Sequence, residues 1–311
     1  VSLAPLSLAI SLNGSDDYIA RLGDNFRYVL KYKNNSDFSI ENVSLRARVT
    51  GEILELGTAR TEGVFNSLTN TFSWSVADDP RLASVAPGEE GSISFDIKLK
   101  STFPIKRLSD KNYLVKVTAE AESPTVPAGT AASKTVSVTN LETKVSGVLS
   151  LDAKGYYRDA PSGILNAGPF PMRVNQPTQL TIHWGLTNYA TDVSGVVVSG
   201  FLLSGAKWTG VVKSNISAAP TYNSASNEVS WKIDKIQATK GVISQPVEAI
   251  FQIEVTPAIN QVGKTIELLS DSKVQAQDNF TGVTLSDIDE DLDTNLPDDT
   301  TLSGVDKKVQ P

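Results

Sequence analysis

The chain has 311 residues, of which 40% are hydrophobic and 20% are charged, as is typical of globular proteins of about two domains. Its formal net charge of −7 argues against nucleic-acid binding, which requires clustered lysine and arginine, and no apolar run approaches the ~18 residues of a membrane span. The absence of cysteine excludes disulfides, thiol nucleophiles and cysteine-based metal sites.

Hydrophobic and polar residues alternate along most of the chain, which predicts β-strands with one buried face. The first half shows this pattern at residues 26–32, 43–49, 72–76, 93–99 and 115–119, and the second half at residues 180–186, 229–233 and 251–255. Turn-forming residues separate these runs, and no helical spacing extends beyond a turn or two. We therefore expect an all-β chain.

One ten-residue phrase occurs twice, first from Phe65 to Trp74 and again from Tyr222 to Trp231. Both copies have Asn-Ser after the opening aromatic residue and end in Ser-Trp, and the offset between them is 157 positions. Residues 116–120 align with 273–277 at the same offset. The pattern predicts two tandem immunoglobulin-like β-sandwich domains, and duplicated modules more often extend, present or bind than catalyse.

The repeat defines the expected domain limits as residues 1–143 for the first sandwich and 144–285 for the second. An insertion at 155–171, rich in aromatic residues, glycine and proline, predicts a long ordered loop or a bent strand pair near the junction. Residues 286–311 are acidic at first and lack alternating apolar residues, so they predict a poorly packed tail or linker.

The first half resembles the conserved-repeat domain that occurs in tandem on bacterial surface proteins, a family of unknown function. The resemblance rests on the spacing of Gly23-Asp24, the strand ending at Asn34-Asn35, Ser73-Trp74 and Ala86-Pro87-Gly88. It implies an extracellular, secreted or wall-attached module that serves as a stalk, envelope or adhesin component, and it implies no catalytic residues. The second half matches only in part.

His183 is the only histidine, and strand alternation places it on the face opposite Leu180, Ile182 and Trp184. We expect it to face solvent or a neighbouring strand. No Gly-x-Ser-x-Gly elbow accompanies it, so a serine-histidine-aspartate triad is not indicated. Paired-carboxylate hydrolysis is not excluded by counting, because 35 acidic residues are available. The favoured interpretation is a protein that is not an enzyme.

Two sets of residues are candidate ligand sites. Trp208, together with Tyr156, Tyr157 and Phe170 of the insertion, forms either an aromatic platform for a sugar or protein or part of the core, and core packing is favoured. Trp74 and Trp231 occupy equivalent strand positions and are expected in the core. The second set suits Ca²⁺ through clustered carboxylate oxygens, and comprises Asp287, Asp289, Asp291 and Asp293.

A solvated acidic linker is the competing interpretation of the second set, because Leu292 stands where a calcium-binding EF-hand loop needs glycine. Apart from this candidate Ca²⁺ site, no cofactor is expected. The sequence thus predicts a non-catalytic structural, spacer or adhesive module. Its expected partners are neighbouring modules of a longer bacterial surface protein. The alternative is a module that binds carbohydrate or protein through the aromatic set.

Overall fold

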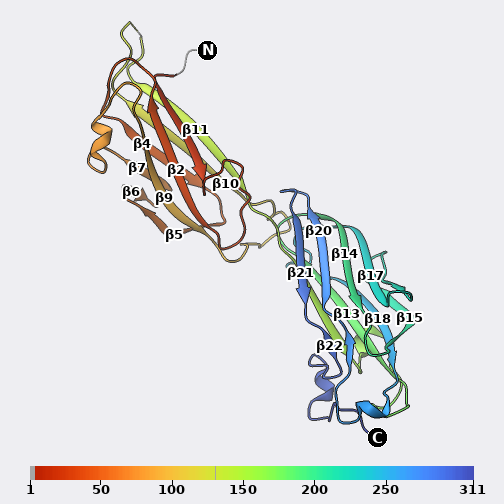
Figure 1. Ribbon diagram of the computed structural model, residues 1–311. Helices are drawn as coiled ribbons and strands as arrows, with labels where there is room; N and C mark the ends of the chain where they lie inside the picture. The colour runs from red at the N-terminus through yellow and green to blue at the C-terminus, as the bar shows by residue number, and fades with distance from the viewer. Residues whose placement is uncertain (1–3, 130) are drawn as a thin grey trace. The chain divides into compact units, whose positions relative to one another are not determined.

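The computed structural model describes residues 4–129 and 131–311 and divides the chain into two compact units. Module 1 comprises Val1–Pro104 and Asn112–Ser146, and module 2 comprises Ile105–Lys111 and Gly147–Pro311. Helical structure in the described residues is limited to four 3-10 turns, η1 (Pro80–Ala83), η2 (Ala160–Ser162), η3 (Ile259–Gln261) and η4 (Thr300–Leu302). None of these turns is long and apolar enough to cross a membrane. The chain is all-β, as the alternating pattern predicts (Figure 1).

Module 1 is a sandwich of two antiparallel sheets, and a short strand pair lies beside them. The four-stranded sheet has the order β1 (Leu6–Leu12), β2 (Asn25–Asn34), β9 (Glu90–Leu99) and β5 (Leu54–Thr61). The five-stranded sheet has the order β11 (Thr135–Lys144), β10 (Leu114–Ser123), β4 (Ser44–Thr50), β7 (Thr71–Trp74) and β6 (Val64–Asn66). The short pair consists of β3 (Ile40–Glu41) and β8 (Ser84–Val85).

Module 2 repeats this strand order, although its loops differ. Its four-stranded sheet has the order β12 (Leu149–Tyr156), β13 (Thr178–Asn188), β18 (Val247–Val255) and β15 (Lys207–Ser214). Its five-stranded sheet has the order β16 (Thr221–Asn223), β17 (Glu228–Ile236), β14 (Val193–Phe201), β20 (Ser272–Asp278) and β21 (Thr284–Asp289). A further pair is formed by β19 (Glu267–Leu269) and β22 (Leu292–Asp293).

The core of each module lies between its two sheets, and alternate residues of the central strands are buried in it. Trp74 of β7, Trp231 of β17 and Trp184 of β13 are all buried, which confirms the predicted core positions. The indole N–H of Trp184 donates to the Ser272 hydroxyl at 2.9 Å, so the polar atom of this ring is satisfied inside the core.

The duplicated phrase is a β-hairpin in both modules. The side-chain oxygen of Asn66 accepts a hydrogen bond from the backbone N–H of Leu68 after β6, and that of Asn223 accepts one from Ala225 after β16. Each turn ends on an asparagine with positive φ, Asn70 (51°) and Asn227 (57°), a conformation that asparagine tolerates. The phrase therefore specifies a turn and the tryptophan-bearing strand that follows it.

The structure corrects the prediction for residues 286–311. This segment is part of module 2, because β21 pairs with β20 and β22 pairs with β19. Apolar residues of the segment and of its approach are buried in the module 2 core, namely Leu285, Leu292, Leu296, Leu302 and Val309. The prediction failed because these residues are spaced irregularly and do not alternate.

Two further boundaries differ from the sequence-based expectation. The first sandwich, expected to end at residue 143, continues through Lys144 of β11 to Ser146, and Gly147 belongs to module 2. The 155–171 insertion begins in the last residues of β12, at the end of that strand away from Gly147. It is therefore at the opposite end of module 2 from the predicted position.

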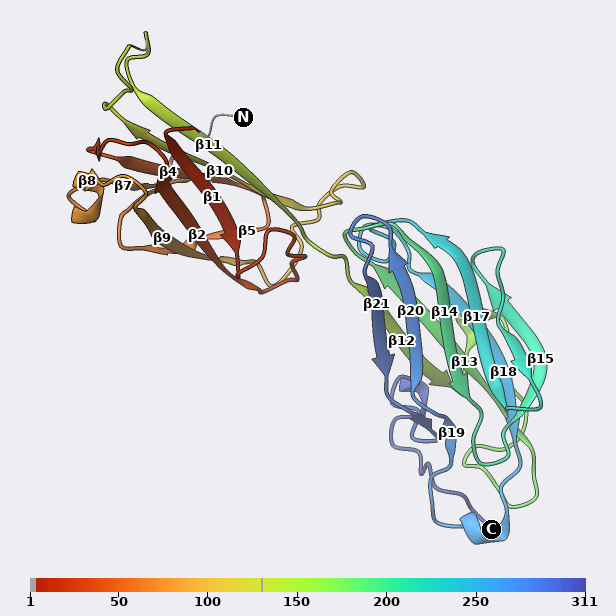
Figure 2. The same cartoon turned by 45° about the horizontal axis from the view of Figure 1, so that its top comes forward.

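Apart from residues 105–111, which belong to module 2 although they lie between two strands of module 1 in the sequence, the chain enters and leaves each module at opposite ends. In module 1 the first strand, β1, lies beside the last, β11, and both run in the same direction (Figure 2). In module 2 the first strand β12 lies beside β21, and their directions also agree. At one end of each module the chain enters and the strand beside the first one begins. At the other end the first strand ends and the chain leaves.

Candidate functional site

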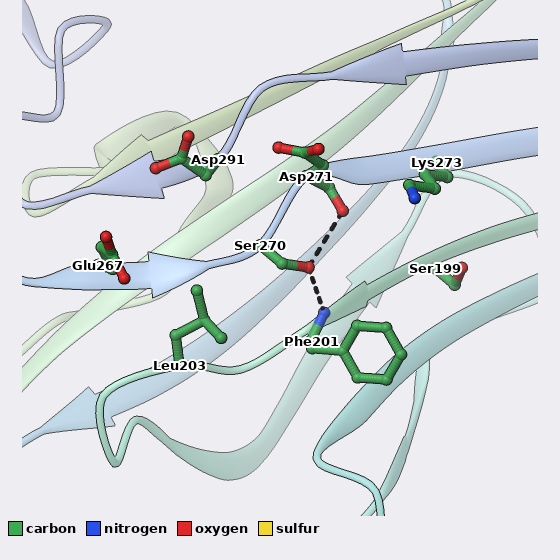
Figure 3. Close-up of a pocket in the computed structure, with 8 residues that line it drawn as sticks. All are labelled: Ser199, Phe201, Leu203, Glu267, Ser270, Asp271, Lys273 and Asp291. Carbon is green, nitrogen blue, oxygen red and sulfur yellow. Dashed lines mark hydrogen bonds between the residues drawn. The ribbon is translucent and has the colours of Figure 1, made fainter.

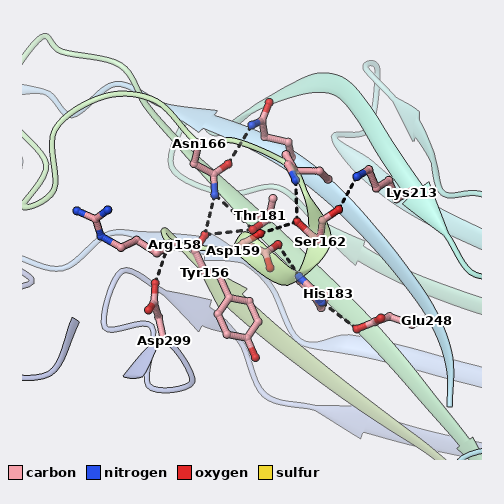
Figure 4. A network of polar contacts seen from close by, with 12 residues as sticks. Tyr156, Arg158, Asp159, Ser162, Asn166, Thr181, His183, Lys213, Glu248 and Asp299 are labelled. Atoms are coloured by element: carbon pink, nitrogen blue, oxygen red, sulfur yellow. Dashed lines mark hydrogen bonds and ion pairs between the residues drawn. The ribbon is translucent and has the colours of Figure 1, made fainter. Parts of the chain in front are cut away.

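The outer face of the four-stranded sheet of module 2 carries a polar cluster centred on His183. The ring lies on the face opposite the core, as predicted, but it is largely covered, with a side-chain exposure of 13%. Its Nε2 lies 2.8 Å from the Asp159 carboxylate, and its Nδ1 lies 2.8 Å from the Glu248 carboxylate (Figure 4). The ring can donate to both carboxylates only when it carries a proton on each nitrogen.

Asp159 belongs to the insertion and is buried against the sheet. Burial alone would raise the pKa of its carboxyl, but hydrogen bonds from His183, Ser162 and Thr181 outweigh that effect and hold the pKa below its usual value. The carboxylate is thus stabilised in its charged form. This buried charge is satisfied by the His183 ring, as buried charges in proteins generally are.

The insertion is held on the sheet by further polar contacts. The side-chain amide of Asn166 donates to the backbone oxygens of Tyr156 (3.2 Å) and Tyr157 (3.0 Å). Gln252 of β18 donates to the oxygen of Leu165 at 3.2 Å and to the side-chain oxygen of Asn166 at 2.9 Å. Lys213 of β15 donates to the Ser162 oxygen. The insertion is therefore an ordered cover, as predicted, and its anchors come from three strands of the sheet.

A pocket of about 400 Å³ opens beside this cluster, between the insertion and the η4 turn. Tyr156 forms one wall, and its ring meets His183 edge-on at 4.9 Å between centroids. The pocket is lined by Tyr156, Arg158, Asp159, Pro161, Ser162, His183, Glu248, Ile250, Asp298, Asp299, Thr300 and Thr301.

The structure does not bring the four predicted aromatic residues together. Tyr156 pairs in register with Thr181 on the outer face of the sheet, whereas Trp208 pairs with Ile253, whose side chain is in the core. Because these faces are on opposite sides of one sheet, Trp208 and Tyr156 do not share a platform. This part of the prediction is wrong.

The other aromatic residues pack within module 2. Trp208 is half-buried, stacks on Tyr222 at 5.7 Å and contacts the buried Phe251 at 5.3 Å. Tyr157 stacks on Phe170 at 5.0 Å, and its hydroxyl donates to the Gly168 oxygen at 2.7 Å. Packing of these side chains against the core is the interpretation that the sequence favoured. Tyr156 is the member of the set that lines the pocket beside His183.

Aspartates from the C-terminal part of the chain accept hydrogen bonds from the backbone of β12. The Asp287 carboxylate accepts from Leu151 at 2.9 Å, and the Asp289 carboxylate accepts from Ala153. Beyond the two ends of β12, Asp278 accepts from Gly147 at 2.9 Å, and Asp299 accepts from Tyr157 at 3.0 Å and Arg158 at 2.9 Å. We call these four aspartates the carboxylate clips.

Three of the four predicted Ca²⁺ ligands accept hydrogen bonds from other groups of the protein. Asp287 and Asp289 bind backbone N–H groups, and Asp293 accepts from the backbone and side chain of Asn295. Within residues 4–129 and 131–311, no three histidine or acidic side chains gather as a metal ion requires. The structure thus does not assemble the predicted Ca²⁺ site from Asp287, Asp289, Asp291 and Asp293.

Asp291 lines a second pocket, of about 450 Å³, on the five-stranded side of module 2 (Figure 3). Its floor includes Ser270, whose hydroxyl accepts from the backbone of Phe201 at 3.0 Å and donates to the Asp271 oxygen at 3.1 Å. The Phe201 ring is 45% exposed. These bonds join the ends of neighbouring strands. Asp291 takes no part in them and is exposed at the rim of the pocket.

Sequence reasoning did not identify Asp159, Glu248 or Asp299 as site residues. Asp159 and Glu248 lie 24 and 65 positions from His183, and only the packing of the insertion on the sheet brings them together. The alternating pattern predicted that His183 faces outward, but no local pattern in the sequence indicates which residues cover an outward-facing side chain.

No protein-family model matches the chain, and no curated protein matches its sequence. Among solved structures, the C-terminal domain of the Streptococcus pyogenes antigen I/II-family protein AspA is 12% identical, with 93% of this chain and 100% of that chain covered and a TM-score of 0.36. The C-terminal domain of the Streptococcus agalactiae AgI/II polypeptide BspA is 11% identical, covers 91% and 98%, and has a TM-score of 0.32.

Bovine butyrophilin is similar to a comparable degree, at 9% identity, with 92% and 99% coverage and a TM-score of 0.29. Likenesses as low as these assign neither a family nor a function. The resemblance of residues 23–95 to a bacterial surface repeat therefore stays a prediction, and the function has to be argued from the residues of this chain.

Proposed function

We propose that the chain is a non-catalytic, force-bearing spacer of a bacterial cell-surface protein, with its two sandwich modules one after the other in the sequence. The observation that carries the proposal is the path of the chain, which enters each module at one end and leaves it at the other. A module with this path keeps a fixed separation between its neighbours, and tension on its ends pulls the first and last strands past each other.

The contacts between first and last strands suit that load. In module 1 the bridge lies just beyond the two strands, between Ala20, in the loop that follows β1, and Val145, directly after β11. Ala20 donates to the Lys144 oxygen at 2.9 Å and accepts from Ser146 at 2.8 Å. In module 2 the clips of Asp287 and Asp289 join β21 to β12. Bonds across strands that slide in parallel are loaded together, so several must break at once before the module opens.

The geometry around His183 supports a role without catalysis. Both ring nitrogens are bound to carboxylates, so neither is available to accept a proton from a hydroxyl nucleophile. The bacterial, extracellular setting follows from the resemblance of the first module to surface repeats, and the partners proposed on the same ground are neighbouring modules of a longer chain.

Single-molecule pulling of the full chain by its two ends tests the spacer role. We expect two separate unfolding events at distinct force peaks, with the larger gain in contour length from module 2, because its polypeptide is longer. Extension of either module without a force peak would contradict the proposal. The height of a force peak reports how fast the module unfolds under load, because forced unfolding is governed by the unfolding rate.

A further inference from the structure

We propose that the pocket beside His183 binds a neutral sugar, one or two units in size. This site goes beyond the spacer role and does not depend on it. The pocket, of about 400 Å³, falls within the size range of small-molecule sites, which is roughly 300–1,000 Å³.

The lining of the pocket mixes hydrogen-bond donors and acceptors. Tyr156, Arg158, Asp298 and Thr300 offer a phenol, a guanidinium, a carboxylate and a hydroxyl. In the described part of the chain, the side chains of Tyr156 and Asp298 make no hydrogen bond, and the Arg158 guanidinium makes only a contact with the Tyr157 ring at 5.6 Å. Sugar hydroxyls both donate and accept, so they can use donors and acceptors placed side by side.

Apolar surface lies next to these groups. The pocket wall includes the Tyr156 ring, Pro161 and Ile250. Tyrosine is suited to such walls because its ring is apolar and its hydroxyl is polar. A sugar has the same division, since its C–H groups lie on the faces of the ring and its hydroxyls lie around the edge.

Two polar residues of the lining are held in place by hydrogen bonds. The His183 ring is fixed from both sides by Asp159 and Glu248, and Asp299 is fixed by two backbone N–H groups and by Thr301. Figure 4 shows the Tyr156 ring between Asp299 on one side and Glu248 on the other. The part of the wall that His183 and Asp299 form is therefore ordered before a ligand binds, so little conformational entropy is lost there on binding.

Charged ligands fit the same lining less well. An anion attracted by Arg158 would meet the carboxylates of Asp298 and Glu248, and a cation attracted by these would meet Arg158. A metal ion would need three converging oxygen ligands, which the described residues do not provide. A neutral ligand with many hydroxyls therefore matches the lining best.

The test uses the full chain and ligand-observed NMR with six neutral sugars: glucose, galactose, mannose, fucose, N-acetylglucosamine and N-acetylgalactosamine. We expect at least one to bind, with an affinity about tenfold weaker in Asp298→Ala and in Tyr156→Phe, because each change removes a hydrogen-bonding group and leaves the buried cluster intact. Asp291→Ala is the matched control, since Asp291 belongs to the same acidic segment but lines the other pocket.

Binding of none of the six sugars would overturn the proposal, as would binding that both pocket variants retain in full. Thermal unfolding of each variant shows that it is folded, so loss of binding can be assigned to the pocket. Tyr156→Phe preserves the ring that packs on His183, which keeps the test valid even if Asp298→Ala is destabilised. The pulling experiment is unaffected by either result.

Discussion

The carboxylate of Asp287 accepts a hydrogen bond from the backbone N–H of Leu151 at 2.9 Å, and it thereby joins the last long strand of module 2 to the first. Asp289 and Ala153 repeat the contact two residues further along both strands. Residues at alternate positions of a strand face the same way, so the two clips act on one edge of β12.

Replacement of the two clips on β21, Asp287→Ala with Asp289→Ala, should weaken module 2 selectively. Each clip is a charge-assisted hydrogen bond at a partly exposed site, so we expect a loss of about 1 kcal/mol per clip in the unfolding free energy. In pulling experiments the force peak of module 2 should fall while that of module 1 stays unchanged. Denaturant unfolding, followed by the fluorescence of Trp184, Trp208 and Trp231, measures the same change at equilibrium.

Two controls separate the clips from the acidity of the segment. Asp287→Asn with Asp289→Asn keeps an oxygen that can accept from the backbone, so it should lose less stability than the alanine pair. Asp291→Ala removes a charge at the exposed rim of another pocket and should leave the force peak unchanged. Equal weakening by all three variants would show that charge, and not the clips, is responsible.

Trp208→Ala should destabilise module 2. The half-buried indole stacks on Tyr222 at 5.7 Å and contacts Phe251, so its removal leaves a gap at the side of the sandwich between β15 and β16. Full truncation of a buried aromatic residue costs about 3–5 kcal/mol, and for this partly exposed ring we expect about 2 kcal/mol. The measurement is a denaturant curve, and an unchanged midpoint would indicate a surface role. Sugar binding should be retained at temperatures where the variant is folded.

The strands and core of both modules could be predicted from the sequence because their signal is local. Trp74 and Trp231 alternate with polar neighbours, and burial of one face of a strand requires that pattern. The role of residues 286–311 could not be predicted, since Asp287 and Asp289 satisfy N–H groups of a strand 136 positions earlier. The carboxylates that bind His183 also come from distant parts of the sequence, Asp159 from the insertion and Glu248 from β18.

A comparison of the two modules gives a further prediction at the end of β2 and β13. The side-chain oxygen of buried Asn34 accepts from the Ser36 hydroxyl at 2.6 Å and from the Ser36 backbone at 2.8 Å. The corresponding oxygen of buried Asn188 has no partner in the described residues, and Ala190 stands where module 1 has Ser36.

We expect Ser36→Ala to cost module 1 about 1 kcal/mol, because it removes a hydrogen bond to a buried acceptor. The reciprocal change Ala190→Ser should stabilise module 2 by up to about 1 kcal/mol, since the new hydroxyl can donate to Asn188. Denaturant unfolding of each variant checks the pair. A loss of stability in Ala190→Ser would mean that the buried site has no room for the hydroxyl.

The stability of module 2 should depend on pH through Asp159. Because the pKa of this carboxyl is lowered in the folded state, the folded module binds its proton less readily than the unfolded chain does. The stability that the Asp159 carboxylate contributes to the folded module is therefore fully present above the ordinary aspartate pKa of about 4. It is lost as the pH falls through the lower pKa that Asp159 has in the folded state. Asp159→Asn removes the charge that His183 binds, so at pH 7 we expect the variant to be less stable by about 2 kcal/mol.

The difference in unfolding free energy between the native protein and Asp159→Asn should narrow as the pH falls below 4, because protonation of Asp159 then removes the same charge from the native protein. The measurement is denaturant unfolding of both proteins at pH 7, 5 and 3, with the tryptophan fluorescence of module 2 as the signal. Asp291→Asn, on the exposed rim of the other pocket, should track the native protein at every pH. A constant gap between native protein and Asp159→Asn from pH 7 to pH 3 would show that the asparagine acts through packing, and that the contact between Asp159 and His183 adds no charge-dependent stability.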